Sequence, residues 1–287
     1  MRLIKMTGGL GNQMFIYAMY MNMKRAFPDT RIDLSDMVHY DVHNGYELHR
    51  IFDLPEDEFL INQKVKKVVE FLFFKTILER KQNLDTLEAY KRKYSWPLIY
   101  FKGFYQSERY FKDIEADVRR AFSFKENLLN EKSRQMLRQI DADPYSVSLH
   151  VRRGDYLDPH SWTNTGSICQ LPYYQNLISA IKEHLPHAHF YVFSDGIDWV
   201  RENLQLSGAT FIDFNKKHDN WQDMMLMSHC RSNAICNSTF SWWGAWLNSN
   251  KEKKVFAPDR WFRNSDMPYL IPDTWIKIPT EWQSVQV

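Results

Sequence analysis

The segment SVSLHVRRGDY, residues 146–156, decides the fold that the sequence predicts. It opens with a run of apolar and small residues at 147–151, which is typical of a buried strand. Arg152 and Arg153 follow directly where that strand should end. Because burying an unpaired ion is costly, two arginines at this place need anionic partners. The segment therefore predicts a strand whose carboxyl end carries an anion-binding loop.

Strands and helices alternate on both sides of this segment. C-terminal to it we expect strands at 189–193, 210–213, 233–237 and 254–257, and helices at 172–185, 197–204, 219–230 and 238–247. N-terminal to it we expect a strand at 2–6, a glycine-rich turn, a helix at 13–27 and a strand at 31–34. Such alternation requires a parallel sheet. We expect an α/β fold of two Rossmann-like domains facing a cleft, with the boundary near residue 140.

Composition narrows the function classes. The 287 residues are 44% hydrophobic and 25% charged, with a net charge of +2, which excludes wholesale disorder and disfavours nucleic acid as a partner. Three cysteines without a paired spacing argue against a disulfide framework or a zinc site, so we expect buried, reduced thiols. We find neither a signal-like start nor a long apolar run, and expect a cytoplasmic protein.

Residues 64–93 form a basic and apolar stretch. They carry nine Lys or Arg against four acidic residues, in an order compatible with helices. One interpretation is the solvated face of a packed helical hairpin. The other is a basic amphipathic helix that makes peripheral contact with the inner membrane or a lipid-linked glycan.

A glycine-rich segment, GGLGNQ at residues 8–13, follows the first expected strand. With Asp33 about 20 residues further on, it suggests a dinucleotide site. The third glycine of that fingerprint is missing, because residue 14 is methionine, and no P-loop lysine follows. We expect instead a loop that approaches a ligand closely, formed by Gly9, Gly11 and the amides of Asn12 and Gln13.

A second junction, NSTFSWWGAW at residues 237–246, leads from a strand into a helix. Its small hydroxyl residues should cap the helix, and the free N–H groups of the first turn should attract an anion. Nine of the ten tryptophans follow residue 160. They fit large core residues, or alternatively a surface on which sugars stack.

Four blocks of the chain, taken together, resemble the α-1,2-fucosyltransferases of glycosyltransferase family 11. The blocks are GGLGNQMF at 8–15, HVRRGDY at 150–156, FSD at 193–195 and NSTFSWWGA at 237–245. The resemblance implies a GT-B fold, with residues 1–140 on the acceptor side and residues 141–287 binding GDP-L-fucose. It implies inverting transfer to the 2-hydroxyl of a galactose-terminated glycan, without cofactor or metal. A bacterial member acting on O-antigen or another surface polysaccharide fits best.

The resemblance also implies residue roles. Arg152 would neutralise the departing β-phosphate, with Arg153 assisting or structural. The other donor-binding residues would be His150 at the guanine or ribose, Ser238, Thr239 and Phe240 at the phosphates, and Asp223 at the guanine. For Asp223, an ordinary acid in the first turn of a helix is an equal alternative.

Three groups are candidates for accepting the proton of the attacking hydroxyl. Asp155 or Asp158 would serve as general base, or the leaving phosphate would take the proton; Asp155 alternatively orients Arg152. Asn12 would orient the acceptor or the fucose ring. Transfer with α-1,6 or α-1,3 linkage is a second hypothesis, and a non-catalytic glycan-binding protein is a third.

Overall fold

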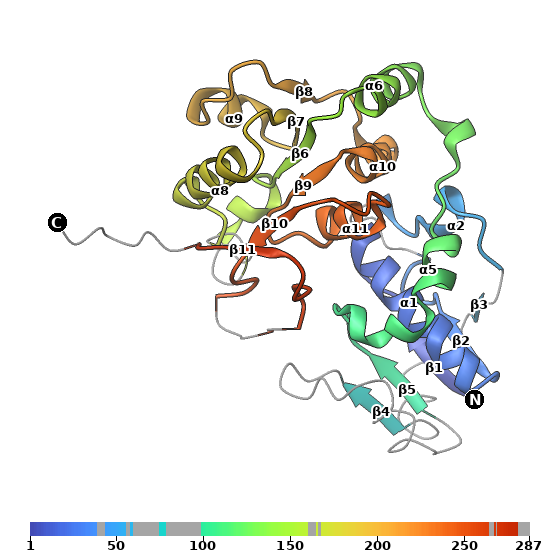
Figure 1. The fold of residues 1–287 in the computed structure, drawn as a ribbon. Coiled ribbons are helices and arrows are strands. Elements are labelled where there is room, and N and C mark those ends of the chain that lie inside the picture. The colour runs from blue at the N-terminus through green and yellow to red at the C-terminus, as the bar shows by residue number, and fades with distance from the viewer. Residues whose placement is uncertain are drawn as a thin grey trace. The chain divides into compact units, whose positions relative to one another are not determined.

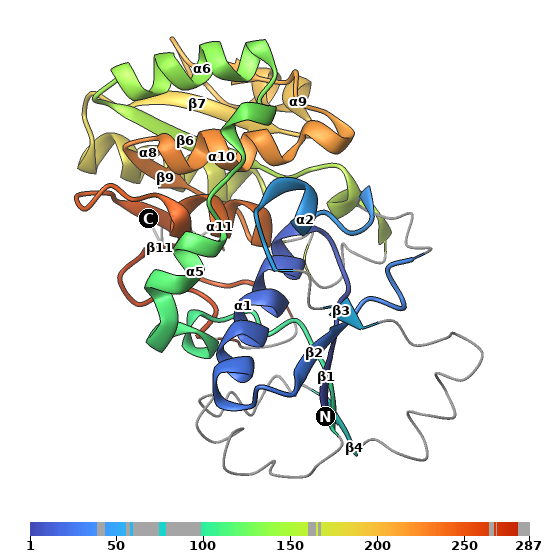
Figure 2. The same cartoon turned by 90° about the vertical axis from the view of Figure 1, so that its right-hand side faces the viewer.

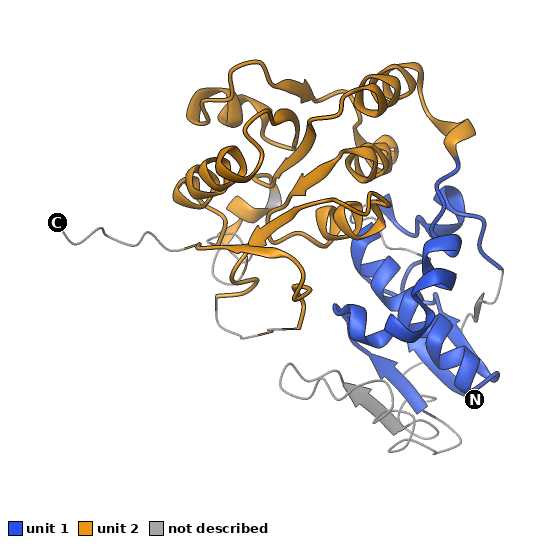
Figure 3. Cartoon of the chain, viewed as in Figure 1, with its two compact units in different colours: residues 1–125 blue, residues 126–287 orange. Residues whose placement is uncertain are grey.

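The computed structural model describes residues 1–38, 44–55, 58–59, 75–78, 99–159, 165, 168–263, 267 and 269–280. The chain divides into two compact units, residues 1–125 and 126–287 (Figure 3). Residues 126–140, which we expected in the first domain, lie in the second unit. There helix α6 (Glu131–Ala142) packs against helix α10 (Trp221–His229).

The first unit contains a parallel sheet with the strand order β3-β2-β1-β5-β4. Its strands are β1 (Arg2–Lys5), β2 (Thr30–Asp33), β3 (Glu58–Phe59), β4 (Lys75–Leu78) and β5 (Ile99–Lys102). Its helices are α1 (Leu10–Ala26), α2 (Leu48–Ile51), α5 (Glu115–Ala121) and the 3-10 turns η2 (Glu108–Tyr110) and η3 (Lys112–Ile114). Because β1 lies in the middle of the sheet and α1 follows it, the glycine-rich turn stands at the carboxyl edge of the sheet.

The basic stretch 64–93 departs in part from the helix that its composition suggested. Residues 75–78 form strand β4, which pairs in parallel with β5. The remainder of the stretch lies outside the described residues, so membrane docking there stays a prediction. In the described part of the chain, every helix is too short or too polar to cross a bilayer.

The second unit contains a six-stranded parallel sheet with the order β11-β10-β9-β6-β7-β8. Its strands are β6 (Ser146–Val151), β7 (His189–Ser194), β8 (Thr210–Ile212), β9 (Ser232–Ala234), β10 (Val255–Pro258) and β11 (Ile276–Ile278). Besides α6 and α10 its helices are α8 (Leu171–His184), α9 (Ile197–Asn203), α11 (Thr239–Leu247) and the turns η4 (Glu126–Leu128), η5 (Asp155–Leu157) and η7 (Lys217–Asp219). Helices α8 and α9 cover one face of the sheet and α6, α10 and α11 cover the other (Figures 1 and 2).

The strand order places a topological switch point between β6 and β9. From β6 the chain proceeds to β7 and β8 on one side, then crosses to β9, β10 and β11 on the other. Open α/β sheets bind ligands beyond the carboxyl ends of the strands at such a point. The segment that begins at Arg152 leaves the sheet there. The parallel sheets of both units confirm the expected α/β class.

The tryptophans of the second unit lie mostly in its core. Trp221, Trp242 and Trp243 are no more than 2% exposed, and the indole N–H of Trp242 donates to the carbonyl oxygen of Leu270 at 2.8 Å. Trp246 is 4% exposed and stacks on Trp242. These side chains therefore stabilise the unit from inside and leave little indole surface for sugars.

Candidate functional site

The carboxylate of Asp195 contacts both of the arginines that follow β6. Strand β7 ends beside β6, with Ser194 opposite Val151, so Asp195 emerges next to the arginine pair. Oδ2 of Asp195 lies 3.1 Å from Nη1 of Arg152. Its Oδ1 accepts a hydrogen bond of 2.7 Å from the backbone N–H of Arg153. Asp195 thus forms an ion pair with the guanidinium of Arg152 and holds the backbone of Arg153 in place.

Gly154 is required by this carboxylate. A Cβ atom at residue 154 would stand 2.7 Å from Oδ2 of Asp195, closer than real Cβ contacts come. Any other residue at this position would force the Asp195 carboxylate to shift. The glycine of the HVRRGDY block therefore serves close packing at the ion pair.

The two arginines have different surroundings. The guanidinium of Arg153 lies 4.2 Å above the ring of Trp199 and donates to Oε1 of Gln170 at 3.2 Å. The guanidinium of Arg152 lies 6.0 Å from the ring of Tyr156, and its side chain keeps 30% of its exposure. Packing therefore fixes Arg153, whereas a role for Arg152 at a bound anion stays a prediction.

The loops after β6 and β9 are tied together across the switch point. The hydroxyl of Tyr156 donates to the carbonyl oxygen of Asn237 at 2.8 Å. The amide of Asn237 in turn donates to the carbonyl oxygens of Thr165 and Trp261, each at 3.0 Å. Asn237 and Tyr156 thereby hold the arginine loop against the start of α11.

Helix α11 begins as the sequence predicted, except for its cap. Ser238 occupies the N-cap position, but its hydroxyl makes no capping hydrogen bond. The backbone carbonyl oxygen of Ser238, in contrast, accepts a hydrogen bond from the Ser241 hydroxyl at 3.3 Å. The first N–H groups of a helix have no intrahelical acceptor, so the start of α11 at Thr239 and Phe240 remains suited to an anion.

His150 lies beneath this edge of the sheet and is 5% exposed. Its ring is 5.9 Å from that of Phe240, and its Nδ1 is 3.3 Å from the sulfur of Cys236. Burial, reinforced by the charge of Arg152 and opposed by that of Asp195, lowers the pKa of His150 to about 3. The imidazole is therefore neutral at physiological pH.

Asp223 lies in the first turn of α10, which follows β8. Its Oδ1 accepts a hydrogen bond of 2.8 Å from Asn215, whose amide also contacts the hydroxyl of Ser133 on α6. Burial raises the pKa of Asp223 to about 8, with the nearby Asp213 adding to the effect. The network links α6, α10 and the loop after β8, and a role at the guanine stays a prediction.

The two candidate bases lie just beyond the arginine pair. Asp155 begins turn η5, and its side chain lies outside the described part of the structure. Asp158 is exposed one residue after this turn. Both assignments stay predictions.

In the first unit, the glycine-rich turn is built around a positive backbone angle. Gly8 has φ +83°, a value that side chains disfavour, and Gly9 is the N-cap of α1. Gly11 is buried in the first turn of that helix. Oδ1 of Asn12 accepts a hydrogen bond of 2.7 Å from Gln106. The half-buried Asn12 is thus the polar side chain that this turn presents.

Gln13 has a structural role rather than the ligand-facing one we expected. It is fully buried, and its amide donates to the carbonyl oxygens of Gly8 at 2.9 Å and Gly45 at 2.8 Å. Its Oε1 accepts from the backbone N–H of Glu47 at 3.0 Å. Two of these bonds connect the turn to residues 45–47, the third closes the turn on Gly8, and no amide group is left for a substrate.

Asp33 also has a structural role. It is fully buried and accepts a hydrogen bond of 2.5 Å from the hydroxyl of Tyr100 and one of 2.9 Å from the backbone of Ser35. A carboxylate bound in this way is unsuited to a ribose, which agrees with our rejection of the dinucleotide fingerprint.

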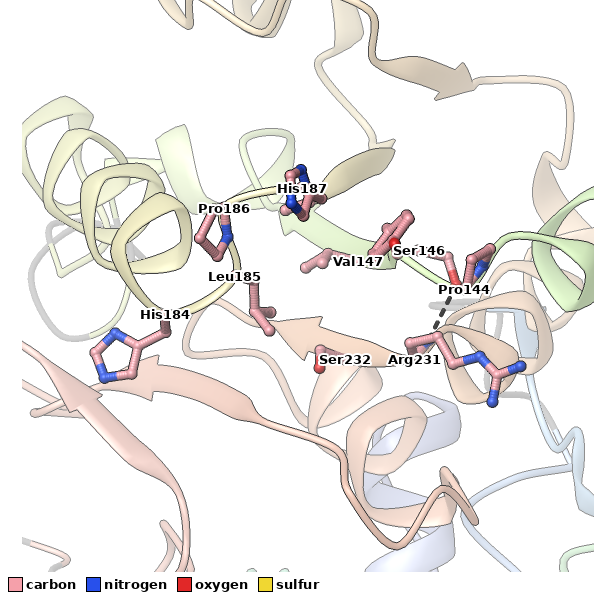
Figure 4. A pocket seen from close by; sticks show the side chains of 11 residues that line it. Pro144, Ser146, Val147, His184, Leu185, Pro186, His187, Arg231 and Ser232 are labelled. Carbon is pink, nitrogen blue, oxygen red and sulfur yellow. Dashed lines mark hydrogen bonds between the residues drawn. The ribbon is translucent and has the colours of Figure 1, made fainter.

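Two further features of the described residues lie away from this site. Within the described ranges, no three His, Cys, Asp or Glu side chains are grouped as metal ligands would be. A mainly apolar pocket of about 160 Å³ lies at the amino ends of β6 and β9, between Leu185, Pro186 and Arg231 (Figure 4). It is at the edge of the sheet opposite Arg152.

Sequence reasoning missed the role of Asp195. The signal was present in the FSD block, because an acid directly after the strand that neighbours β6 must emerge beside the arginines. It also missed Gln170 and Trp199, which support Arg153 from α8 and α9. Their contacts depend on helix packing that spacing alone does not specify.

Comparisons with known proteins identify relatives over nearly the whole chain. Residues 2–269 match the family described as Glycosyl transferase family 11. The chain is 30% identical to an alpha-1,2-colitosyltransferase of Escherichia coli, covering 96% of this chain and 97% of the relative. It is 31% identical to the O-antigen biosynthesis glycosyltransferase WbnK of Escherichia coli, covering 95% and 99%.

A more distant human relative matches part of the chain. The chain is 28% identical to human galactoside alpha-(1,2)-fucosyltransferase 1 over 161 residues, which are 53% of this chain and 43% of that protein. The family match and the full-length relatives agree with the four sequence blocks. The chain therefore belongs to glycosyltransferase family 11 and is a glycosyltransferase with an α/β fold.

Proposed function

We propose that the enzyme transfers L-fucose from GDP-β-L-fucose to the 2-hydroxyl of a terminal β-galactoside, with inversion, to form an α-1,2 linkage. The observation that carries this proposal is the placement of Arg152, held by Asp195 at the switch point of the second sheet. The first turn of α11 lies at the neighbouring strand end. Together they suit a nucleoside diphosphate that leaves as an anion.

In this reaction the bond between the sugar and the β-phosphate breaks ahead of attack, so negative charge builds on the β-phosphate oxygen. Arg152 neutralises that charge, a contact worth about 3 to 4 kcal/mol of transition-state stabilisation. The N–H groups at Thr239 and Phe240 hold the phosphates, with the hydroxyl of Ser238. The neutral His150 hydrogen-bonds the guanine or ribose without adding charge.

The acceptor hydroxyl must lose a proton as it attacks. Asp155 or Asp158 takes it, or the departing phosphate does. A pH profile of the Asp155→Asn and Asp158→Asn variants separates these routes: loss of the acidic limb with one variant identifies the base, and retention with both assigns the proton to the phosphate. Asn12 orients a sugar through its amide.

The names of the relatives support linkage and context. Two of them carry the α-1,2 linkage in their names, and one is named for O-antigen biosynthesis. On this basis the acceptor is a galactose-terminated glycan of a bacterial surface polysaccharide, and the protein acts in the cytoplasm or peripherally at the inner membrane.

The test is an assay with GDP-fucose and terminal β-galactosides, with and without EDTA. We expect GDP release at the same rate in both conditions, and an α-1,2-linked product by NMR. A 1,3- or 1,6-linked product would contradict the linkage, and glycan binding without turnover would favour a non-catalytic protein.

A second donor is a specific candidate, because one full-length relative is named a colitosyltransferase. Colitose is fucose without its 3-hydroxyl group, so GDP-colitose presents the same diphosphate to Arg152. A competition assay with both donors decides between them. A higher kcat/KM for GDP-colitose would replace fucose in the proposal and leave the role of Arg152 unchanged.

A further inference from the structure

Cys236 is a buried thiol that the proposed chemistry does not use. It directly precedes the Asn237–Ser238 junction and is fully buried. Its sulfur lies 3.3 Å from Nδ1 of His150, well within hydrogen-bonding distance for sulfur. Strands β9 and β6 are neighbours, and Cys236 lies just after the end of β9, so the thiol and the imidazole meet at the same edge of the sheet.

With both groups neutral, two directions are open to this hydrogen bond: the S–H donates to Nδ1, or an Nδ1–H donates to the sulfur. Burial raises the pKa of Cys236 to about 12, despite the opposing charge of Arg152, so the thiol keeps its proton. The imidazole of His150 is neutral, as described above, and carries one proton. The sulfur receives hydrogen bonds from the backbone of Arg152 and from the side chain of Ser241, which favours the direction in which its own S–H donates to Nδ1.

We propose that Cys236 is a positioning residue: its S–H donates to Nδ1 of His150, and the imidazole therefore carries its proton on Nε2. A neutral histidine with an acceptor at Nδ1 is a hydrogen-bond donor at Nε2. Within the described part of the chain, Nε2 makes no hydrogen bond. Cys236 thus presets His150 to donate to an acceptor atom of the ligand.

The ligand class follows from the site and rests on the proposed function. A nucleotide offers carbonyl oxygens, ring nitrogens and ribose hydroxyls as acceptors for an N–H donor. The opposite tautomer would present a lone pair at Nε2 and would repel carbonyl oxygens and ring nitrogens, although it could accept from a ribose hydroxyl. Cys236 thereby favours a nucleotide orientation in which an acceptor atom meets Nε2.

The tautomer can be measured directly in the unliganded protein. Long-range ¹H–¹⁵N spectra of histidine-labelled protein distinguish a protonated from an unprotonated ring nitrogen, and His150→Gln assigns the signal. We expect protonation at Nε2 in the wild type and in Cys236→Ser, which keeps a donor. In Cys236→Ala part of the population should move its proton to Nδ1. A proton on Nδ1 in the wild type overturns the proposal.

GDP affinity gives the functional readout. Loss of one neutral hydrogen bond should weaken GDP binding about fivefold in Cys236→Ala, and serine should restore it. Cys230→Ala is the matched control, because Cys230 is also buried and donates to a backbone carbonyl. In a His150→Gln background, Cys236→Ala should have no further effect. An equal loss in that background would assign Cys236 a purely structural role and overturn the proposal.

The two readouts keep this inference separate from the proposed function. If the wild type fails to bind GDP, the proposed donor is wrong, and the spectrum still decides the tautomer. If GDP binds and the spectrum places the proton on Nδ1, the proposed sugar donor is retained and the proposed role of Cys236 is wrong.

Discussion

The loops that follow β1 and β6 occupy equivalent places in their sheets but are built differently. The loop after β1 is neutral, and the buried Gln13 connects its turn to residues 45–47 through two hydrogen bonds to the backbone, with a third to Gly8 within the turn. The loop after β6 carries two arginines, and a partly exposed carboxylate, Asp195, holds them. One loop uses its polar groups for its own structure, whereas the other keeps a cation near the surface.

The difference between the two loops separates side chains that stabilise the fold from side chains that are available to a substrate. A buried amide that satisfies backbone groups contributes to stability and cannot turn to a substrate without leaving them unpaired. A partly exposed guanidinium contributes little to stability through its ion pair, and it can exchange that partner for a phosphate. We therefore expect changes after β6 to affect turnover and changes after β1 to affect folding.

The largest expected effect is that of Arg152→Ala. Loss of the cation at the β-phosphate should reduce kcat by a factor of about 100 to 1000, which is 3 to 4 kcal/mol. Steady-state kinetics with the natural donor measures this, and chemical denaturation should show an unchanged free energy of unfolding.

Arg201→Ala is the matched control for that variant. Arg201 also pairs with an aspartate in the second unit, at 3.8 Å from Asp213, but it belongs to α9 and is half exposed. Its replacement should leave kcat unchanged. Equal losses for both arginines would mean that net charge, and not the position of Arg152, supports the reaction.

Gln13→Leu tests the loop after β1. Two carbonyl groups and one N–H group lose their partner in the interior, which should lower the free energy of unfolding by about 3 kcal/mol. Urea denaturation measures the loss. Within the described residues, the amide of the buried Gln106 contacts only the Asn12 side chain, so Gln106→Leu should cost about 1 kcal/mol. Unchanged stability with lost turnover would place Gln13 at the substrate instead.

Asp223→Asn tests a buried acid of the second unit through pH. Its folded-state pKa of about 8 lies above the ordinary value of 3.8, so its stabilising contribution is complete below pH 3.8 and is lost as the pH rises to 8. Asparagine keeps the acceptor for Asn215 and removes the charge. The variant should gain about 1 to 2 kcal/mol over the wild type at pH 8 and little at pH 4.

The gain should be read from urea unfolding at both pH values. A variant less stable than the wild type at pH 8 would show that the Asp223 charge has a favourable partner in the folded protein.

The smallest expected effect is that of Asp195→Asn. The amide keeps an acceptor for the backbone N–H of Arg153, so the loop should fold, but Arg152 loses its ionic partner. We expect kcat/KM to fall about three- to fivefold, the value of a partly exposed ion pair. A loss as large as that of Arg152→Ala would mean that Asp195 itself contacts the reacting groups.

Much of the second unit could be predicted from its sequence. The strands after residue 146 are short apolar runs separated by helices, so the parallel sheet follows from alternation, whereas the spatial order of its strands and the switch point do not. Arg152 and Arg153 were placed at the ligand edge because charged residues directly follow a buried strand. The register of β6 and β7 places Asp195 next to these arginines, but its role follows only from its contact with Arg152.

Other features depend on packing that no local pattern encodes. Strand β4 lies in a basic stretch whose composition favoured a helix, and pairing with β5 overrides that preference. Gln13 looked like a ligand-binding amide because its partners at Gly45 and Glu47 are more than 30 residues away. The missing Ser238 cap likewise depends on how the junction after β9 turns into α11.

The most direct test is a crystal structure of the enzyme with bound GDP-fucose, or with GDP and an acceptor. The central claim predicts the guanidinium of Arg152 at charge-assisted hydrogen-bonding distance, about 2.7 to 2.9 Å, from a β-phosphate oxygen. Asp195 should still hold the backbone of Arg153 in that complex. A diphosphate bound away from Arg152, or bridged by a metal ion in its place, would contradict the claim.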